Sequence, residues 1–365
     1  MEIPLVDLKS QYKTIKKDID AAIFEVIEKS QFIDGPLLKR FESNFAAFCG
    51  AKYCVGTSNG TSSIYCALKA IGLKPGDEII TAANTFIATT EAISLAGGKF
   101  KLVDIDKRSY NMDIASLKNT ISNKTKAIIP IHMYGHPCDL EPIYEIAKEK
   151  DLFVIEDAAQ AHGARYRGKR IGSLGGVVSF SFFPAKILGC YGDGGAIVTN
   201  DKELSEKIRL EVDHGRHSKY EHIKEGFNFR LDTLQANILN AKLKYLEEWI
   251  KKRRQNAQIY NENLSDFVTV PYEEEYAEHS YYMYVIRVKM RERLVKFLKE
   301  RGIGTGIHYP IPLHKQEAYR NIPTGSFPVT DEISSQILSI PNYPELSVEQ
   351  QEYIYKSIKE FYNSV

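Results

Sequence analysis

The sequence predicts an α/β protein with two domains: a large domain built on a mostly parallel, mixed sheet, and a smaller α+β domain at the C-terminal end. Short β-rich runs alternate with helical stretches from about residue 52, as in a parallel sheet with crossover helices. The chain has 365 residues, more than the roughly 100–200 residues typical of one domain. We expect a large domain over residues 1–250, including an N-terminal helical segment, and a small domain over residues 251–365.

The first fifty residues predict two helices. Between residues 12 and 29, apolar side chains recur at helical spacing and form one stripe. The sequence Asp34-Gly35-Pro36 interrupts this pattern. An amphipathic helix then follows, and its apolar side carries Leu38, Phe41, Phe45 and Phe48.

Six β-rich runs follow in the large domain, and we expect each to form a strand. They are Asp77–Ala83, Lys99–Ile105, Lys126–Ile131, Leu152–Glu156, Val177–Phe182 and Ala196–Thr199. The segment Asp139–Lys150 has the apolar spacing of a crossover helix between the third and fourth runs. This repetition of strand, helix and strand favours a largely parallel sheet.

The pattern changes near Asp232, where a long helix begins. It is expected to end in the basic run Lys251–Arg254, which either binds phosphate or forms a solvated helix end whose cations suit the helix dipole. The second interpretation is favoured. Beyond the run we expect a strand at Tyr281–Val288, a helix at Arg291–Arg301 closed by glycine, and a final helix from about Val348.

The composition excludes several classes of protein. The hydrophobic share of 43% and the charged share of 26% are ordinary for a globular protein, and the net charge of +1 gives no field that would attract nucleic acid or an anionic membrane. The five cysteines show no CxxC pairing, so neither a disulfide framework nor a structural metal site is expected. The first residues carry acidic side chains unlike a signal peptide, and no apolar run reaches the ~20 residues of a membrane helix. We expect a soluble, cytoplasmic protein.

Two ionisable residues follow neighbouring strands. Asp157 comes directly after the run Leu152–Glu156, and Lys186 lies in an aromatic, glycine-rich loop after Val177–Phe182. Ligands of open parallel sheets bind at the carboxyl ends of the strands. An acid and a lysine there suit pyridoxal 5′-phosphate (PLP), because the acid keeps the pyridine nitrogen protonated while the lysine binds the aldehyde. A buried salt bridge between the two residues is the alternative.

A segment of small polar residues, Thr57–Ser63, precedes the helical stretch Ile64–Ala70. Hydroxyl groups and free backbone N–H groups at the start of a helix suit a phosphate. An ordinary N-cap made by serine or threonine is the alternative.

These segments, in their order, resemble the PLP-dependent sugar aminotransferases of the DegT/DnrJ/StrS family. The resemblance implies the aspartate aminotransferase fold (fold type I) and runs nearly end to end. The blocks that carry it are Ile3–Leu8, Phe32–Gly35, Ser58–Thr61, Asn84–Thr89, His132–His136, Glu156–Gly163, Ser179–Gly195, Gly226–Asp232, His308–Pro310 and Leu338–Pro341.

The resemblance also implies roles for individual residues. Lys186 is expected to be the Schiff-base lysine and the acid/base that moves a proton between the substrate and the cofactor. Asp157 is expected at the pyridinium nitrogen and Gln160 at the ring hydroxyl. The ring of Phe86 is expected to stack on the cofactor; packing in the core is its alternative. The expected phosphate contacts are Gly60, Thr61, Ser181 and, from the partner subunit of a homodimer, Asn228.

The sequence departs from the family pattern beside the lysine and in the phosphate segment. Ala185 and Ile187 stand where the family often has polar or small residues, which puts any hydrogen bond there in doubt. Asn59 and Ser62-Ser63 stand where the family often shows serine, aspartate and alanine, which is a milder change.

In this family the amino group passes, usually from L-glutamate, to a nucleotide-linked keto-sugar. The segment Gly302–Gln316 is similar to members that act at C3, so we expect a dTDP-linked 3-keto-6-deoxyhexose to give a dTDP-3-amino-3,6-dideoxyhexose. A C4 aminotransferase and a UDP-2-acetamido-3-keto-sugar aminotransferase are the alternatives, and a PLP-binding regulatory protein is the non-enzymatic one. The expected sugar contacts are His308, Tyr309, Lys219 and Arg230. A solvated loop is the alternative for Lys219, and Arg230 could serve a uronate carboxylate.

Overall fold

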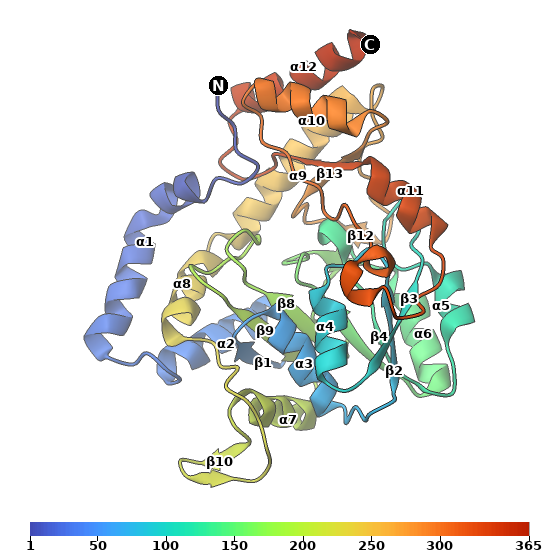
Figure 1. The fold of residues 1–365 in the computed structure, drawn as a ribbon. Helices are drawn as coiled ribbons and strands as arrows, with labels where there is room; N and C mark the ends of the chain where they lie inside the picture. Colours follow the sequence, from blue (N-terminus) through green and yellow to red (C-terminus); the bar gives the residue numbers. More distant parts are fainter. Residues whose placement is uncertain (365) are drawn as a thin grey trace.

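The computed structural model describes residues 1–364, and a seven-stranded sheet lies at its centre (Figure 1). Its strands are β1 (Tyr53–Thr57), β2 (Glu78–Ala82), β3 (Lys99–Val103), β4 (Thr125–Ile129), β5 (Phe153–Asp157), β8 (Val177–Ser181) and β9 (Gly195–Thr199). Their order across the sheet is β1-β9-β8-β5-β4-β2-β3. Strand β9 runs antiparallel to both neighbours, and the other pairings are parallel. All six runs predicted as strands belong to this sheet, and the prediction of a mostly parallel, mixed sheet is confirmed.

Helices cover this sheet and bury its apolar side chains. They are α2 (Pro36–Cys49), α3 (Gly60–Ala70), α4 (Ala88–Leu95), α5 (Ile114–Thr120), α6 (Leu140–Lys150) and α7 (Lys202–Val212). Helix α3 packs against β8 and β9, α2 against β1, and α6 against β5. Fully buried Phe45 of α2 makes edge contacts with the rings of Phe180 and Phe182 from β8 and the loop after it. The amphipathic helix after Pro36 and the crossover helix before β5 are therefore as predicted.

The N-terminal helix α1 (Leu8–Lys29) lies beside α8 (Thr233–Leu243) at one side of the sheet (Figure 1). Its buried residues Ile15 and Ile19 pack with Ile238 and Trp249. This small core confirms the predicted apolar stripe between residues 12 and 29.

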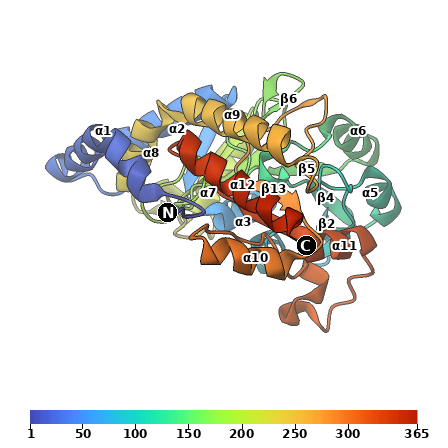
Figure 2. The ribbon, with the colours of Figure 1, turned by 90° about the horizontal axis from the view of Figure 1, so that it is seen from above.

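A second large core lies in the C-terminal part of the chain. Strand β13 (Tyr284–Arg287) pairs antiparallel with β14 (Ile337–Ile340), and α9 (Leu246–Leu264), α10 (Arg291–Glu300) and α12 (Val348–Asn363) complete this core, whereas α11 (Pro328–Gln336) packs against the main core. The side chain of Ile3 belongs to the same core. Its backbone N–H donates to the Gly302 carbonyl and its carbonyl accepts from the Gly304 N–H, both at 2.8 Å. Both ends of the chain therefore lie at the same end of the molecule (Figures 1 and 2).

Short strands and turns make up the remaining structure. Strands β6 (Arg165–Tyr166), β7 (Lys169–Arg170) and β12 (Ala277–Glu278) form a small sheet. A hairpin of β10 (Arg216–Ser218) and β11 (Glu221–His222) projects from the body of the protein (Figure 1). Within residues 1–364 no helix has both the length and the apolar character needed to cross a membrane.

The basic run does not end a helix, so that prediction was wrong. The long helix is two helices, α8 and α9 (Leu246–Leu264), and the run lies inside α9. Lys251 and Lys252 are exposed, but Arg253 is buried and its Nη1 donates to the carbonyl oxygens of Tyr281, Tyr282 and Asn342. Arg253 therefore ties α9 to two segments of the C-terminal core, contacts that local sequence does not reveal. The division of the chain at residue 250 falls within α9 and stays a prediction.

We expect Arg253→Met to lower the free energy of unfolding by roughly 2 kcal/mol. The carbonyl groups of Tyr281, Tyr282 and Asn342 would lose their donor, and water does not reach this buried position to replace it. Urea denaturation measures this change. Lys252→Met on the same helix is the control, since its exposed pair with Glu248 is worth at most about 0.5 kcal/mol. Equal stability of the two variants would contradict a clamping role for Arg253.

Candidate active site

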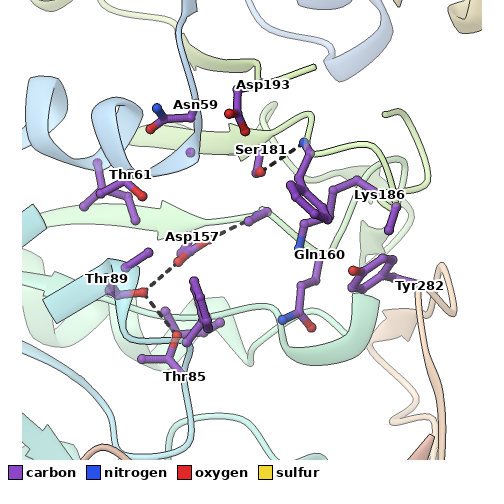
Figure 3. A pocket seen from close by; sticks show the side chains of 18 of the residues that line it. Asn59, Thr61, Thr85, Thr89, Asp157, Gln160, Ser181, Lys186, Asp193 and Tyr282 are labelled. Carbon is purple, nitrogen blue, oxygen red and sulfur yellow. Dashed lines mark hydrogen bonds between the residues drawn. The ribbon is translucent and has the colours of Figure 1, made fainter. Parts of the chain in front are cut away.

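A cavity of about 730 Å³ opens at the carboxyl ends of the parallel strands (Figure 3). Residues at or just after the ends of β1, β2, β4, β5 and β8 line it. The C-terminal core contributes Tyr282, Met283, His308 and Tyr309, and the N-terminal segment contributes Leu5 and Val6. The cavity therefore combines the edge of the main sheet with segments from both the N-terminal and the C-terminal parts of the chain.

Most of the residues predicted for the site come together in this cavity. Those that line it are Gly60, Thr61, Phe86, Asp157, Gln160, Ser181, Lys186, His308 and Tyr309. Lys219, Asn228 and Arg230 do not line it. Lys219 is exposed in the turn of the β10–β11 hairpin, Asn228 is exposed, and Arg230 pairs with Asp213.

Asp157 is the last residue of β5, and its carboxylate is buried. Thr89 Oγ1 donates to Asp157 Oδ2 at 3.0 Å, and the Ala159 backbone N–H donates to Asp157 Oδ1 at 3.1 Å. Thr85 Oγ1 lies 3.1 Å from Thr89 Oγ1, and since the Thr89 proton is used, Thr85 is the donor there. Burial raises the pKa of Asp157, while these hydrogen bonds and the charge of Lys186 act in the opposite direction.

Lys186 lies in the loop between β8 and β9, half-buried at the cavity wall. Its Nζ lies 4.5 Å from the centroid of the Tyr282 ring, and within residues 1–364 it forms neither a hydrogen bond nor an ion pair. The alternative of a salt bridge between Lys186 and Asp157 is therefore excluded for the described chain. Of its unusual neighbours, Ala185 lines the cavity and Ile187 is buried in the core, so neither supplies a polar contact.

The start of α3 forms a cradle of donors beside Ser181. Asn59 and Ser62 cap the helix, because the Ser62 N–H donates to Asn59 Oδ1 at 2.9 Å and the Asn59 N–H donates to Ser62 Oγ at 3.1 Å. Within the described residues, the backbone N–H groups of Gly60 and Thr61 have no acceptor. A Cβ atom at Gly60 would lie 2.8 Å from Ser181 Cβ, so glycine allows the close approach of α3 to β8. The N-cap that was the alternative to a phosphate site is present, but it leaves the N–H groups of Gly60 and Thr61 available to an anion.

Aromatic and polar groups close the other side of the cavity. Gln160 Oε1 accepts from the Tyr134 backbone N–H at 2.7 Å, and its Nε2 donates to Tyr309 OH at 3.4 Å, which leaves the second N–H of Nε2 able to donate. The Phe86 ring is 52% exposed and lies 5.2 Å from the Tyr309 ring, so it is not a core aromatic. His308 Nδ1 contacts Ser339 Oγ at 2.8 Å, and burial lowers the pKa of His308, with a further contribution from the charge of Lys186.

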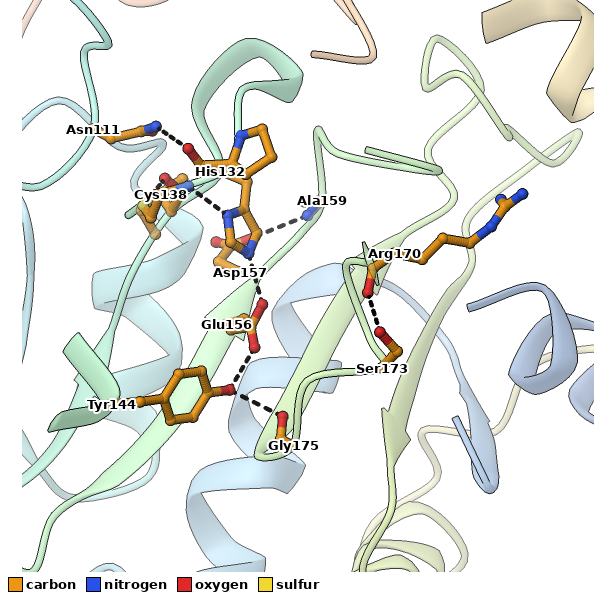
Figure 4. Close-up of polar contacts among 12 residues, drawn as sticks. Asn111, His132, Cys138, Tyr144, Glu156, Asp157, Ala159, Arg170, Ser173 and Gly175 are labelled. Carbon is orange, nitrogen blue, oxygen red and sulfur yellow. Dashed lines mark hydrogen bonds and ion pairs between the residues drawn. The ribbon is translucent and has the colours of Figure 1, made fainter. Parts of the chain in front are cut away.

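A polar network centred on the fully buried His132 and Glu156 supports the end of β5 (Figure 4). His132 Nδ1 accepts from the Cys138 backbone N–H at 3.0 Å, so the proton lies on Nε2 and is donated to Glu156 Oε2 at 2.9 Å. Tyr144 OH donates to the other oxygen of Glu156 at 2.6 Å. Both oxygens of the Glu156 carboxylate are thus paired immediately before Asp157. This network fixes the position of the strand end from behind the cavity.

Several contact residues were not predicted from the sequence. Thr85, Thr89, Asp193 and Tyr282 all line the cavity. Thr85 and Thr89 lie in the motif Asn84–Thr89, and their spacing of four residues was a signal that could have paired them, although only Thr89 lies in α4. Nothing in the local pattern around Tyr282 distinguishes it from its aromatic neighbours.

The chain is similar to known proteins over nearly all its length. A model of the DegT/DnrJ/EryC1/StrS aminotransferase family matches residues 13–359. The pleiotropic regulatory protein of Geobacillus stearothermophilus is 45% identical, over 99% of each chain. The dTDP-3-amino-3,6-dideoxy-alpha-D-galactopyranose transaminase of Aneurinibacillus thermoaerophilus is 43% identical, over 98% of this chain and 99% of the relative. The UDP-2-acetamido-2-deoxy-3-oxo-D-glucuronate aminotransferase of Pseudomonas aeruginosa is 45% identical, over 94% and 96%.

A solved structure has nearly the same fold. The crystal structure of DesV from S. venezuelae, in complex with a ketimine intermediate, superposes with a TM-score of 0.98. The two sequences are 37% identical, and the match covers 100% of this chain and 99% of DesV.

We expect Asp157→Asn to make the ligand-free protein more stable at pH 7. The pKa of Asp157 is raised in the folded state, so the carboxyl group stabilises the fold below its ordinary pKa and loses that contribution as the pH rises through its folded pKa. Asparagine cannot ionise, and it retains partners in Thr89 and Ala159. The gain should be on the order of 1 kcal/mol at pH 7 and should vanish near pH 4.

Urea denaturation of the ligand-free protein at both pH values measures this difference. Asp193→Asn is the control, because Asp193 lines the same cavity but is exposed. A loss of stability of equal size at both pH values would show that the hydrogen bonds of Asp157, rather than its buried charge, dominate.

Proposed function

This chain belongs to the DegT/DnrJ/EryC1/StrS aminotransferase family, and from that premise we propose that it transfers an amino group from L-glutamate to C3 of a dTDP-linked 3-keto-6-deoxyhexose. The predicted family, the aspartate aminotransferase fold and the prediction of a PLP-dependent aminotransferase are confirmed. The observation that carries the proposal for the site is that Asp157 and Lys186 meet in one cavity without neutralising each other. The product would be a dTDP-3-amino-3,6-dideoxyhexose.

The residues of the cavity fit PLP, which when bound supplies an electron-accepting pyridine ring and an aldehyde that binds amino groups. The Asp157 carboxylate is buried, forms no ion pair within residues 1–364, and would accept the pyridinium N–H. The second N–H of Gln160 Nε2, the one not directed at Tyr309 OH, would donate to the ring hydroxyl, and Phe86 would cover one face of the ring. Gly60, Thr61 and Ser181 would hold the phosphate, with two unpaired N–H groups and two hydroxyls.

Lys186 would carry the acid/base chemistry. In the resting enzyme its Nζ would hold the cofactor, and once released it would take a proton from the glutamate carbon that bears the amino group. The amine is free to do so, because within residues 1–364 it is bound to no carboxylate and faces only the Tyr282 ring. The same atom would return a proton to the sugar carbon in the second half of the reaction.

The sugar would lie toward His308 and Tyr309. Burial lowers the pKa of His308, so its ring would be neutral near pH 7 and would contact hydroxyl groups rather than an anion. Arg230, the residue that could have bound a uronate carboxylate, pairs with Asp213. Lys186 is the only lysine or arginine among the described residues that line the cavity. These observations favour a neutral 6-deoxyhexose over a hexuronate, although relatives acting on both types are similar to this chain.

We further propose that the active enzyme is a homodimer with shared sites. Asn228 is exposed and lies outside the cavity of its own chain, and so does Lys219. Exposed apolar side chains accompany them: Phe227 is 46% exposed and Ile223 is 58% exposed. In the dimer the partner subunit's Asn228 would reach the phosphate and the partner subunit's Lys219 would reach the substrate.

The substrate is tested by incubating the protein with PLP, L-glutamate and a panel of nucleotide-linked keto-sugars, with mass spectrometry of the products. The panel contains dTDP-linked 3-keto and 4-keto-6-deoxyhexoses, a UDP-2-acetamido-3-keto-hexose and its uronate. We expect an amino-sugar from the dTDP-linked 3-keto sugar and none from Lys186→Ala. A product from the uronate alone would overturn our interpretation of Arg230 and His308.

A regulatory function makes a different prediction in the same experiment. Glutamate bleaches the visible colour of a working PLP aminotransferase, because the cofactor accepts its amino group. A protein that binds PLP, but neither bleaches nor aminates any sugar of the panel, would match the relative named as a regulatory protein.

Shared sites are tested by mixing two inactive variants. Lys186→Ala and Asn228→Ala are each expected to be nearly inactive as homodimers. After mixing and subunit exchange, a mixed dimer contains one site with both native residues, so about a quarter of the wild-type activity should return. No recovery, with exchange verified by native mass spectrometry, would place Asn228 outside the partner's site.

A further inference from the structure

Helix α8 carries a lysine whose side chain is completely buried. Lys242 has 0% exposure, and its Nζ donates to the carbonyl oxygen of Gly189 at 2.6 Å. Within residues 1–364 no carboxylate pairs with it, and burial lowers its pKa to about 8. An unpaired ammonium group in the interior costs stability, so its presence calls for a function.

The acceptor of this hydrogen bond lies in the loop that carries Lys186. Gly189 follows Lys186 by three residues, and the loop turns back so tightly that a Cβ atom at Gly189 would lie 2.2 Å from the carbonyl oxygen of Pro184. The Lys186 N–H donates to Phe183 O at 2.8 Å, and the Cys190 N–H donates to Phe182 O at 2.9 Å. These two backbone hydrogen bonds connect the start of the turn to its end. A hydrogen bond that fixes the Gly189 carbonyl therefore also restricts the position of the Lys186 backbone.

Helix α8 holds the next part of the loop as well. Lys242 Nζ lies 4.3 Å from the centroid of the Tyr191 ring, a favourable position for a cation. Gln235, two helical turns earlier, accepts from the Tyr191 N–H at 2.8 Å and donates to the Tyr191 carbonyl at 3.2 Å. Helix α8 itself packs against α1 and α2, so both side chains project from a fixed support.

We propose that Lys242 is a positioning residue for Lys186: through Gly189 it fixes the turn that presents the reactive amine to the cavity. This inference rests on the proposed role of Lys186. Lys242 does not line the cavity and touches neither substrate nor cofactor site. It acts through a charge-assisted hydrogen bond, which is stronger than the bond a neutral donor would make.

The experiment compares Lys242→Met with Lys244→Met. The first variant removes the donor but keeps much of the buried apolar stem, and the second removes an exposed lysine two residues away. Each apoprotein is mixed with PLP, samples are reduced with borohydride at increasing times, and mass spectrometry gives the fraction of Lys186 that carries the cofactor. The pH at which the visible band of the bound cofactor changes is measured in parallel.

We expect attachment to Lys186 to be about tenfold slower in Lys242→Met, because a misplaced amine reacts less often. We also expect the pH midpoint of the visible band to shift by about half a unit or more, whereas Lys244→Met should match the wild type. If Lys242→Met folds and both values equal those of the control, Lys242 only fills the core and the proposal is wrong.

Two other outcomes are a variant that does not fold and a wild type whose Lys186 binds no cofactor. If Lys242→Met does not fold, Lys242→Gln replaces it, since that variant removes the charge from the donor to the Gly189 carbonyl, and the same two readouts decide. If Lys186 of the wild type carries no cofactor after reduction, the proposed function of Lys186 fails, and the role of Lys242 fails with it.

Discussion

Asp157 ends the central strand β5 with its carboxylate buried and in no ion pair within residues 1–364, and the arrangement of the site depends on this constraint. A hydroxyl group and a backbone N–H are the only donors that the described chain gives it. The paired Glu156 and His132 hold the strand end from behind, and α4 supplies Thr89 from the front. A buried charge that the protein leaves incompletely compensated destabilises the empty fold, and it is most favourable when a cationic ligand group arrives. The large aromatic and aliphatic core around the sheet supplies the stability that such a site requires.

The antiparallel strand β9 has a consequence for the lysine. A parallel connection between β8 and β9 would have to cross to the opposite edge of the sheet, and it would lead the chain away from the cavity. Since β9 runs antiparallel, the chain returns directly, and the Phe182 N–H bonds to the Gly194 carbonyl at 2.7 Å. Lys186 therefore lies in a hairpin connection anchored at both ends, beside the strand that carries Asp157. Helix α8 then holds this connection from the side opposite the cavity.

The C-terminal core and the N-terminal segment close the site together. The backbone of Ile3 is bonded on both sides of Ile303, and this places Leu5 and Val6 at the wall of the cavity. Arg253 joins α9 to the segment that contains Tyr282, which faces Lys186. The groups that would meet the sugar thus come from parts of the chain far from the residues that would hold the cofactor, and the contacts of Tyr309 with Gln160 and Phe86 join the two sets.

The sequence by itself determined the strands, the amphipathic helices and the pair Asp157 and Lys186. Hydrophobic spacing is a local property, and the carboxyl ends of parallel strands meet at one edge whatever the loops do. The tertiary structure alone decided that these two residues form no salt bridge within residues 1–364, that the basic run lies within α9 with Arg253 buried, and that Thr89 bonds to Asp157 and Lys242 to Gly189. Thr89 bonds to a residue 68 positions away, and Lys242 to one 53 positions away. Such contacts depend on how distant segments pack, and neither spacing nor composition encodes that packing.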